Sequence, residues 1–281
     1  MTNQQELHAQ TRQLLRDLIQ QPEERIDLAE AALLIAAGEY PDLDRGKYIR
    51  RLDTMAETVR QRIGSTADPR QIIAKINQYL FQEEGFSGNS EDYYDPRNSF
   101  LNEVLERKTG IPITLSTVYL AIAWRLKFPL FGVGMPGHFL VKHPHGKILI
   151  DPFAKGRILT EEDCWEQMKQ LLGESVPVHK SYLEGVSKRQ IVTRMLNNLR
   201  GIYLNTRQFH SALNITETAL ALNPESLDEL KQKAMLLLRL HRYSEALAGL
   251  NHYLAAMPEA KDAEKIRQTV TNLKKVLAQM N

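Results

Sequence analysis

The C-terminal part of this sequence contains an internal repeat of 34 residues, and this repeat restricts the fold more than any other feature. A shift of 34 positions aligns similar residues in five pairs: Tyr203 with Leu237, Phe209 with Tyr243, Ala212 with Ala246, Leu220 with Leu254, and Pro224 with Pro258. Small residues at fixed positions let two helices approach closely, and each proline ends the second helix of a pair. The sequence therefore predicts stacked helix pairs in this region.

This period and pattern are those of the tetratricopeptide repeat. We predict two repeats, at about residues 193–226 and 227–260, and a capping helix at 262–280. One face of that last helix carries apolar residues, and its other faces carry Lys and Arg. Two repeats alone bury little core, so the cap or the preceding domain must cover their ends.

Composition places the chain among globular proteins, because 43% of its residues are hydrophobic and 25% are charged. Its single cysteine, Cys164, excludes an intramolecular disulfide and a site of several thiolates, so we expect a reducing compartment, the cytoplasm. The polar start lacks the pattern of a signal peptide, and no apolar stretch approaches the roughly 18 residues of a membrane span. Neither secretion nor membrane insertion is expected.

Charge is distributed unevenly along the chain. The net charge is +2, but Ser187 to Asn281 carries +6 and the remainder carries −4. Without a known motif, this basic excess is too small to indicate nucleic-acid binding. It fits an acidic protein partner better.

The part before the repeats changes from a helical pattern to a strand-like pattern. An unusually apolar run from Thr114 to Lys127 predicts a buried central helix. The other predicted elements are helices around Leu14–Leu18, Leu28–Ile35, 44–63 and from Asp68-Pro69, a loop at 85–98, a short helix capped by Ser99, strands at 131–135, 138–142 and 147–151, a helix at 161–172 and a linker at 173–180. This order predicts an α+β domain over residues 1–176, with a helical extension at its start, ahead of an all-α array over 177–281.

Two polar residues on neighbouring predicted strands are expected to meet. If Lys142 pairs with Lys147 across an antiparallel turn, then His138 lies opposite Asp151 on the same face. Papain-like hydrolases place a histidine and an acid on such strands after a buried helix. The carboxylate would fix the imidazole tautomer and leave the other ring nitrogen to act as a base.

Four motifs between Tyr93 and Phe153 are specific enough to indicate a family. They are Asn98-Ser-Phe-Leu-Asn-Glu-Val-Leu-Glu-Arg107, Gly110-Ile-Pro-Ile-Thr-Leu-Ser116, Pro136-Gly-His-Phe-Leu140 and Ile150-Asp-Pro-Phe153. With them the sequence resembles the transglutaminase-like core of the bacterial SirB-type proteins, which carry a tetratricopeptide region behind it. The resemblance implies a papain-like fold, with a Cys nucleophile at the start of the central helix and His and Asp on the following strands.

The sequence departs from that pattern at the nucleophile. No cysteine lies near residues 112–116, and Cys164 follows the aspartate. The nearest hydroxyls belong to Thr114 and Ser116, so one interpretation is a Ser116–His138–Asp151 arrangement with helix amides holding an oxyanion. The alternative interpretation is that these hydroxyls cap the helix and that His138 and Asp151 are vestigial or form a polar ligand pocket.

The first helix of each repeat normally faces a concave groove that binds an extended peptide. Residues of that face that can grip a carboxylate or a peptide backbone are Arg194, Asn197, Asn205, Lys231 and Arg239. A merely solvated groove, or one filled by the first domain, is the alternative.

Other features carry weaker signals. His138 and His143 alternate to opposite faces of their strand, and no acidic cluster accompanies His145, so we expect neither a metal nor a cofactor. Tyr93 and Tyr94 fit either a recognition patch or packing over the central helix.

The missing cysteine and the clear repeat together favour one function. The sequence predicts a non-catalytic adaptor or regulatory protein that binds a protein or peptide through its repeats. The alternative is a hydrolase or acyltransferase that uses Ser116, His138 and Asp151.

Overall fold

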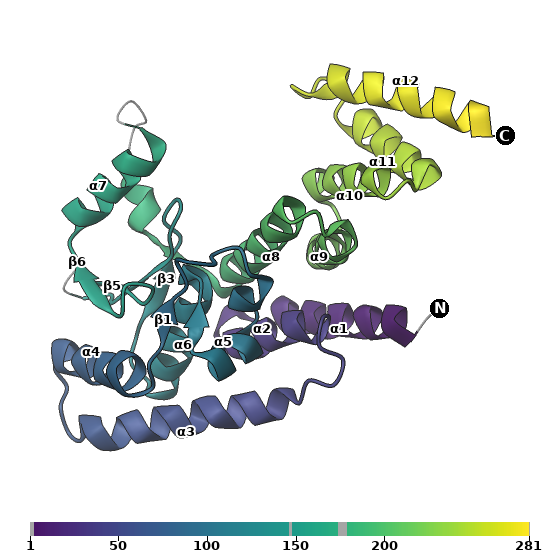
Figure 1. The fold of residues 1–281 in the computed structure, drawn as a ribbon. Coiled ribbons are helices and arrows are strands. Elements are labelled where there is room, and N and C mark those ends of the chain that lie inside the picture. The colour runs from purple at the N-terminus through teal and green to yellow at the C-terminus, as the bar shows by residue number, and fades with distance from the viewer. Residues whose placement is uncertain (1–2, 146–147, 174–178, 281) are drawn as a thin grey trace. The chain divides into compact units, whose positions relative to one another are not determined.

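The structure is a computed structural model that describes residues 3–145, 148–173 and 179–280. By its contacts the chain divides into two compact units (Figure 1). We call Met1–Leu7 with Asp17–Met195 the core unit, and His8–Arg16 with Leu196–Asn281 the repeat unit. The domain boundary predicted at 176/177 lies among residues 174–178, outside the described residues.

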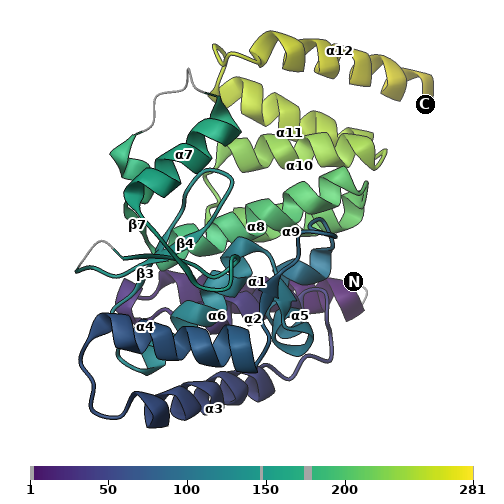
Figure 2. The same ribbon diagram turned by 60° about the vertical axis from the view of Figure 1, so that its left-hand side comes forward.

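The core unit combines helices with a small antiparallel sheet, and its central helix α6 (Pro112–Arg125) lies between them (Figures 1 and 2). Its other elements, in chain order, are α1 (Asn3–Gln20, shared with the repeat unit), η1 (Glu23–Arg25), α2 (Leu28–Ala37), α3 (Arg45–Ile63), α4 (Pro69–Asn77), η2 (Gln78–Glu83), β1 (Ser87–Gly88), η3 (Pro96–Ser99), α5 (Leu101–Arg107), β2 (Thr109–Gly110), β3 (Phe131–Val133), β4 (Leu140–Lys142), β5 (Leu149–Asp151), β6 (Arg157–Leu159), α7 (Glu161–Leu172), η4 (Lys180–Leu183), β7 (Gly185–Val186) and the start of α8 (Lys188–Asn205, also shared).

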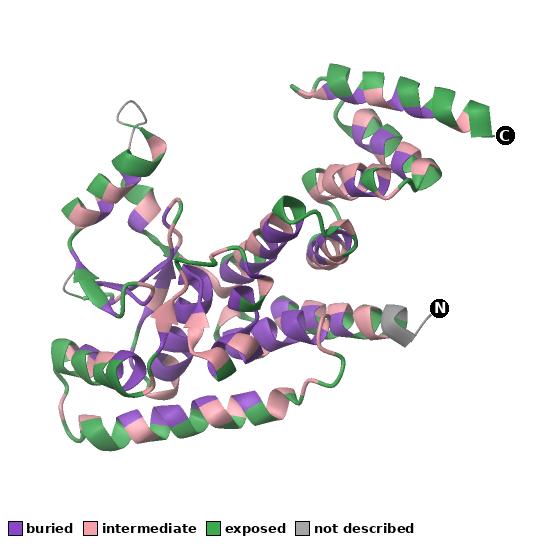
Figure 3. Ribbon diagram, in the orientation of Figure 1, coloured by how far each residue is buried: buried purple, intermediate pink, exposed green. Residues whose placement is uncertain are grey.

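Helix α6 is the buried central helix that its composition predicts. Every residue from Pro112 to Ala123 is buried, as expected for a helix that is apolar on all sides. It packs against helices α2, α3 and α5 on one side and strands β3 and β4 on the other. Figure 3 shows the resulting contrast with α3, where buried residues lie on one side and exposed residues on the other. The helix begins at Pro112, not at the predicted Thr114, because proline fits the first turn of a helix.

The main sheet has five antiparallel strands in the order β6-β5-β4-β3-β7. The predicted register between β4 and β5 is wrong by two residues, because Lys142 pairs with Leu149. The cause is a longer turn, in which the backbone N–H of His143 donates to the carbonyl of Ile148 at 3.0 Å. A shift of two residues keeps every side chain on its predicted face, since side chains alternate with a period of two.

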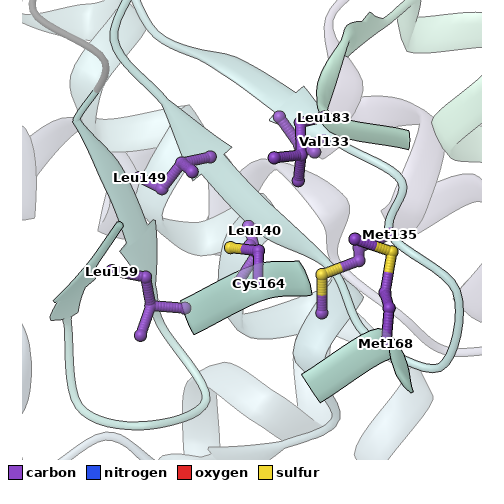
Figure 4. Close-up of a cluster of buried hydrophobic side chains, with 8 residues drawn as sticks. All are labelled: Val133, Met135, Leu140, Leu149, Leu159, Cys164, Met168 and Leu183. Atoms are coloured by element: carbon purple, nitrogen blue, oxygen red, sulfur yellow. The ribbon is translucent and has the colours of Figure 1, made fainter. Parts of the chain in front are cut away.

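The sequence pattern does not predict strands β6 and β7. They lie outside the longer apolar runs that indicate β3, β4 and β5, although those strands also contain only three residues each. Leu159 of β6 belongs to a hydrophobic cluster between the sheet and α7, which Figure 4 shows with Cys164 and Met168 of that helix. Leu183 of η4 joins this cluster, and Ile191 of α8 lies against Gly132 of β3. Residues up to Met195 therefore belong to the core unit.

The helix ends show which of the capping residues in the sequence cap a helix in the structure. Asp68 caps α4 as predicted, and Asp44, predicted as the first residue of its helix, caps α3. Both side chains accept from backbone N–H groups of the first turn. Ser99 does not cap α5, because a short helix that begins after Asp95 places Ser99 at its end. Helix α8 begins at Lys188, earlier than residue 193, because Ser187 and Gln190 form a capping box.

The repeat unit holds the two predicted helix pairs and the capping helix. Its elements are the end of α8, α9 (Phe209–Leu222), α10 (Leu227–Arg239), α11 (Tyr243–Ala256) and α12 (Ala263–Met280). Ala212 and Ala246 are fully buried, as close helix packing requires, and Pro224 and Pro258 follow the ends of α9 and α11. In the described part of the chain, no helix combines the length and the apolar character needed to cross a membrane.

Candidate functional site

The predicted contact between His138 and Asp151 is present in the core unit. The Nε2 atom of His138 lies 2.7 Å from Oδ2 of Asp151. The other carboxylate oxygen, Oδ1, accepts from the backbone N–H groups of Phe153 at 3.0 Å and Ala154 at 3.1 Å. These three bonds hold the carboxylate in one orientation, and a neutral His138 then donates from Nε2 and keeps its lone pair on Nδ1.

Local sequence places each member of this pair. Gly137 has φ of +70° in the turn after Met135, and this turn directs His138 back toward the sheet. Asp151 ends β5, and its bond from Phe153 forms an Asx turn. Gly156, with φ of +76°, donates its N–H to the backbone carbonyl of Asp151 at 2.8 Å. His138 thus lies just before strand β4 and Asp151 at the end of strand β5, where its side chain is only 6% exposed.

Aromatic rings surround the histidine. The ring of Phe153 meets the imidazole of His138 edge-on at 6.0 Å, and the ring of Tyr93 lies 6.3 Å from Phe153. Gly88 leaves room for Phe153, because a β-carbon there would lie 2.6 Å from the phenyl ring. Burial raises the pKa of the Tyr93 hydroxyl. Tyr93 therefore packs beside the pair, while its neighbour Tyr94 is 55% exposed.

Arg194 supports the backbone that carries the histidine. Its Nη2 atom donates to the carbonyl of Met135 at 2.7 Å and to that of His138 at 2.6 Å. Its guanidinium also lies over the ring of Phe139, at 5.5 Å, and burial lowers its pKa. The repeat pattern assigns Arg194 to the peptide groove, but these contacts engage it in the core unit instead.

The hydroxyls at the start of α6 have hydrogen-bond partners other than the imidazole of His138. Thr114 donates to the carbonyl of Asn98 at 2.7 Å and accepts from the N–H of Ile111, which is a capping role from the third helical position. Ser116 is fully buried and donates to the carbonyl of Phe139 at 3.2 Å. Within the described residues no hydrogen bond joins Ser116 to His138, so the structure does not assemble the third member of the predicted triad.

The only thiol in the sequence forms no hydrogen bond with this pair within the described residues. Cys164 is buried in the hydrophobic cluster of Figure 4, and burial raises its pKa to about 11. A thiol in that state is neutral near pH 7 and is a poor nucleophile.

Other sequence-predicted residues have separate environments. Asn197 accepts from Arg200, and Lys231 donates to Asp262 at 2.9 Å. Asn205 and Arg239 are exposed. Lys231 is thus engaged by an acid that precedes the capping helix, which leaves Asn205 and Arg239 as the groove candidates open to solvent.

His143 of the β4–β5 turn has an aromatic environment. His143 is buried and stacks on Phe128 at 5.1 Å. Among the residues that the structure describes, no group of three or more His, Cys, Asp or Glu side chains is placed to hold a metal ion.

Sequence reasoning missed two residues that organise the site. One is Arg194 as a backbone support. The other is the fully buried Asn98, whose side chain donates to the carbonyl of Asp92 at 2.7 Å and accepts from Asn89. An asparagine beside apolar residues at a helix start could have predicted such a residue, because a buried side-chain amide must find partners for its hydrogen bonds. Nothing local in the sequence predicts the partners of Arg194.

Comparisons with known proteins agree with this architecture. The family described as Transglutaminase-like superfamily matches residues 46–197, and the family described as Tetratricopeptide repeat matches residues 199–271. The combination that the resemblance implies is therefore confirmed, although these descriptions do not carry the SirB designation.

Three relatives illustrate the range of similarity. A UPF0162 protein of Xylella fastidiosa is 37% identical over 256 residues, which cover 89% of this chain and 91% of the relative. A UPF0162 protein of Pseudomonas aeruginosa is 36% identical over 200 residues, which cover 70% and 72%. The F-box only protein 21 of Homo sapiens is 36% identical over 140 residues, or 46% of this chain and 21% of that protein. The fold, the His138–Asp151 pair and these matches together show that the chain belongs to the transglutaminase-like superfamily, together with the bacterial UPF0162 proteins.

Proposed function

We propose that this protein is a non-catalytic adaptor or regulator that binds a protein partner through its tetratricopeptide repeats. The observation that carries the proposal is the bonding of Ser116, whose buried hydroxyl is held by the carbonyl of Phe139 while the His138–Asp151 pair stands without a nucleophile. The core then acts as a scaffold, and the repeats supply the interaction.

Energetic reasoning supports an inactive hydroxyl. To attack a substrate, Ser116 must break its bond to Phe139 in a fully buried site, and leaving a buried polar group unsatisfied costs about 1–3 kcal/mol. A hydroxyl is also a weak nucleophile unless a base removes its proton, and Ser116 has no hydrogen bond to His138. Both costs add to the barrier of any reaction at this position.

The repeats support binding. Tetratricopeptide arrays present extended surfaces, and the basic excess from residue 187 onward favours an acidic protein partner over nucleic acid. The lone buried thiol fits a reducing compartment, so we place this interaction in the cytoplasm.

A fluorophosphonate probe and a partner-capture experiment on the full chain test the proposal together. We expect no labelling of the native protein, and we expect His138→Ala to capture the same cellular partner as the wild type. Labelling that disappears in Ser116→Ala would overturn the non-catalytic assignment. Loss of the partner in His138→Ala would show that binding depends on the core site and would overturn the assignment of binding to the repeats.

Hydrolysis or acyl transfer is the second candidate function, and the His138–Asp151 pair favours it. Its geometry is that of an oriented base, and Nδ1 of His138 has no hydrogen-bond partner in the described part of the chain. This function requires Ser116 to turn toward that nitrogen when a substrate binds. Turnover of an ester substrate that is lost by several orders of magnitude in both Ser116→Ala and His138→Ala would establish it.

A further inference from the structure

One end of the repeat unit carries a depression lined by Leu204, Arg207, Phe209 and Arg239, which we call the basic corner. It lies where α8 ends, α9 begins and α10 ends. Both arginines are exposed, and Leu204 is 37% exposed. The basic corner therefore offers positive charge and apolar surface side by side.

Within the part of the chain that the structure describes, neither arginine of the basic corner has an acidic partner. The two turns at this end, residues 204–210 and 238–244, contain three arginines and no Asp or Glu. One of them, Arg242, is bound by Glu245 through two hydrogen bonds of 2.7 and 2.6 Å. Arg207 and Arg239 form no side-chain hydrogen bond or ion pair within the described residues.

A comparison of the two repeats shows what is missing. Glu245 lies in the first turn of α11, where it binds Arg242 and faces the positive end of the helix. The 34-residue shift places Ser211 at the equivalent position of α9, and the first turn of α9 contains no acidic residue. The same shift pairs Gln208 with Arg242 and Arg207 with His241, so the first repeat has an arginine in this turn and no acidic residue in the helix start that follows it.

An external carboxylate would pair with Arg207 and Arg239, which have no side-chain partner among the described residues. Arginine recognises carboxylates through paired N–H donors, and an apolar side chain beside the acid would cover Leu204 and Phe209. Two arginines and a small apolar surface fit a short acidic segment of a polypeptide. A nucleic-acid backbone would need a longer basic track.

We propose that the basic corner is a docking site for an acidic segment of a partner protein, in which a carboxylate bridges Arg207 and Arg239 and a neighbouring apolar side chain packs on Leu204 and Phe209. The inference rests on the proposed adaptor function and specifies the chemistry of its partner. The carboxylate belongs either to an Asp or Glu side chain or to a chain terminus, and the experiment separates these sources.

The test selects ligands for the full chain from two libraries of random peptides, one displayed with a free C-terminus and one with the C-terminus blocked. We expect selected peptides to combine Asp or Glu with Leu or Phe. Selection from the blocked library identifies a side-chain carboxylate, and selection from the free library alone identifies a terminal carboxylate.

Affinities of a selected synthetic peptide are then measured by fluorescence anisotropy. The double variant Arg207→Glu/Arg239→Glu should bind at least about tenfold more weakly, because repulsion replaces attraction at two positions. The variant Arg207→Gln/Arg239→Gln removes the charges without reversing them and should weaken binding less. The matched control Lys274→Glu/Lys275→Glu changes the net charge equally on exposed positions of α12 and should bind within about twofold of the wild type.

Three results would overturn the inference: no selected peptide, selected peptides without acidic residues, or equal affinity for the wild type and both corner variants. Tighter binding of a single-stranded oligonucleotide than of the selected peptide would overturn it as well. These failures leave the adaptor function standing if the cellular partner is still captured. If no partner is captured and the fluorophosphonate labels Ser116, it is the adaptor function that fails.

Discussion

Replacing Asp151 by alanine removes three hydrogen bonds from the core unit at once. They join its carboxylate to Nε2 of His138 and to the backbone N–H groups of Phe153 and Ala154. The replacement Asp151→Asn is more selective, because the amide oxygen can still accept from both backbone groups while its NH2 group faces His138.

The expected cost follows from burial and partners. A hydrogen bond to a charged group contributes about 1.5–3 kcal/mol net, and the 6% exposure of Asp151 places its bond to His138 in the middle of that range. The N–H of half-buried Phe153 loses about 1 kcal/mol more, whereas exposed Ala154 regains a bond from water. We therefore expect Asp151→Ala to lower the free energy of unfolding by about 3–4 kcal/mol, and Asp151→Asn by about 1–2 kcal/mol.

Urea unfolding followed by tryptophan fluorescence measures this loss of stability in the core unit, because both tryptophans, Trp124 and Trp165, lie there. The control is Asp53→Ala, which breaks an exposed ion pair with Arg125 and should cost less than about 1 kcal/mol. Equal costs for Asp151→Ala and the control would refute the reasoning.

A double-mutant cycle isolates the pair itself. His138→Ala and Asp151→Asn should be non-additive by about 1 kcal/mol or more, since each removes the same hydrogen bond. Additive effects would show that the two side chains contribute to stability independently.

Three further predictions concern other parts of the chain. Burial raises the pKa of Cys164 to about 11, so native protein should not release thionitrobenzoate from dithiobisnitrobenzoate at pH 8 until urea unfolds it, and immediate release would contradict this. The stability that this thiol contributes is complete below the pKa of an unfolded cysteine and is lost as pH rises through about 11. In the repeat unit, Gly201→Ala should raise the free energy of unfolding by about 0.5–1 kcal/mol, because the added β-carbon meets open space. Gly249→Ala should not raise it, because its β-carbon falls 2.9 Å from a β-carbon of α10. Equal shifts of the melting temperature in circular dichroism would refute this packing argument. Burial acts to raise the pKa of the Asp95 carboxyl, but hydrogen bonds from Arg97 outweigh burial and lower this pKa. The stability that the Asp95 carboxylate contributes is therefore complete above the unfolded value of 3.8 and is lost as pH falls through the lower folded value. Asp95→Asn should therefore be less stable than the wild type at pH 7 and should depend less on pH between about 5 and 2, as urea midpoints will show.

Much of the fold is predictable because its signals are local or periodic. The caps at Asp44 and Asp68 involve groups within three residues, and the repeat places Ala212 and Ala246 at the same point of two helix pairs. Strands β6 and β7 give no such signal, because they do not lie in five-residue apolar runs like those that contain β3, β4 and β5.

The candidate site is predictable in part for the same reason. His138 and Asp151 share a face in any register that differs by two residues, so their contact survives the longer turn between β4 and β5. The position of Ser116 is different, because its sequence neighbours do not decide where its hydroxyl points.

The sequence by itself determined the two-part organisation, the buried central helix and the meeting of a histidine with an aspartate, since each follows from periodicity or from nearby residues. Only the tertiary structure decided that Ser116 donates to the carbonyl of Phe139 and that Arg194 donates to those of Met135 and His138. The partners in these bonds lie 23 to 59 residues apart, and they meet because helices α6 and α8 pack against the segment that carries the histidine. Packing at that range depends on the shape of the whole core, which no local pattern in the chain records.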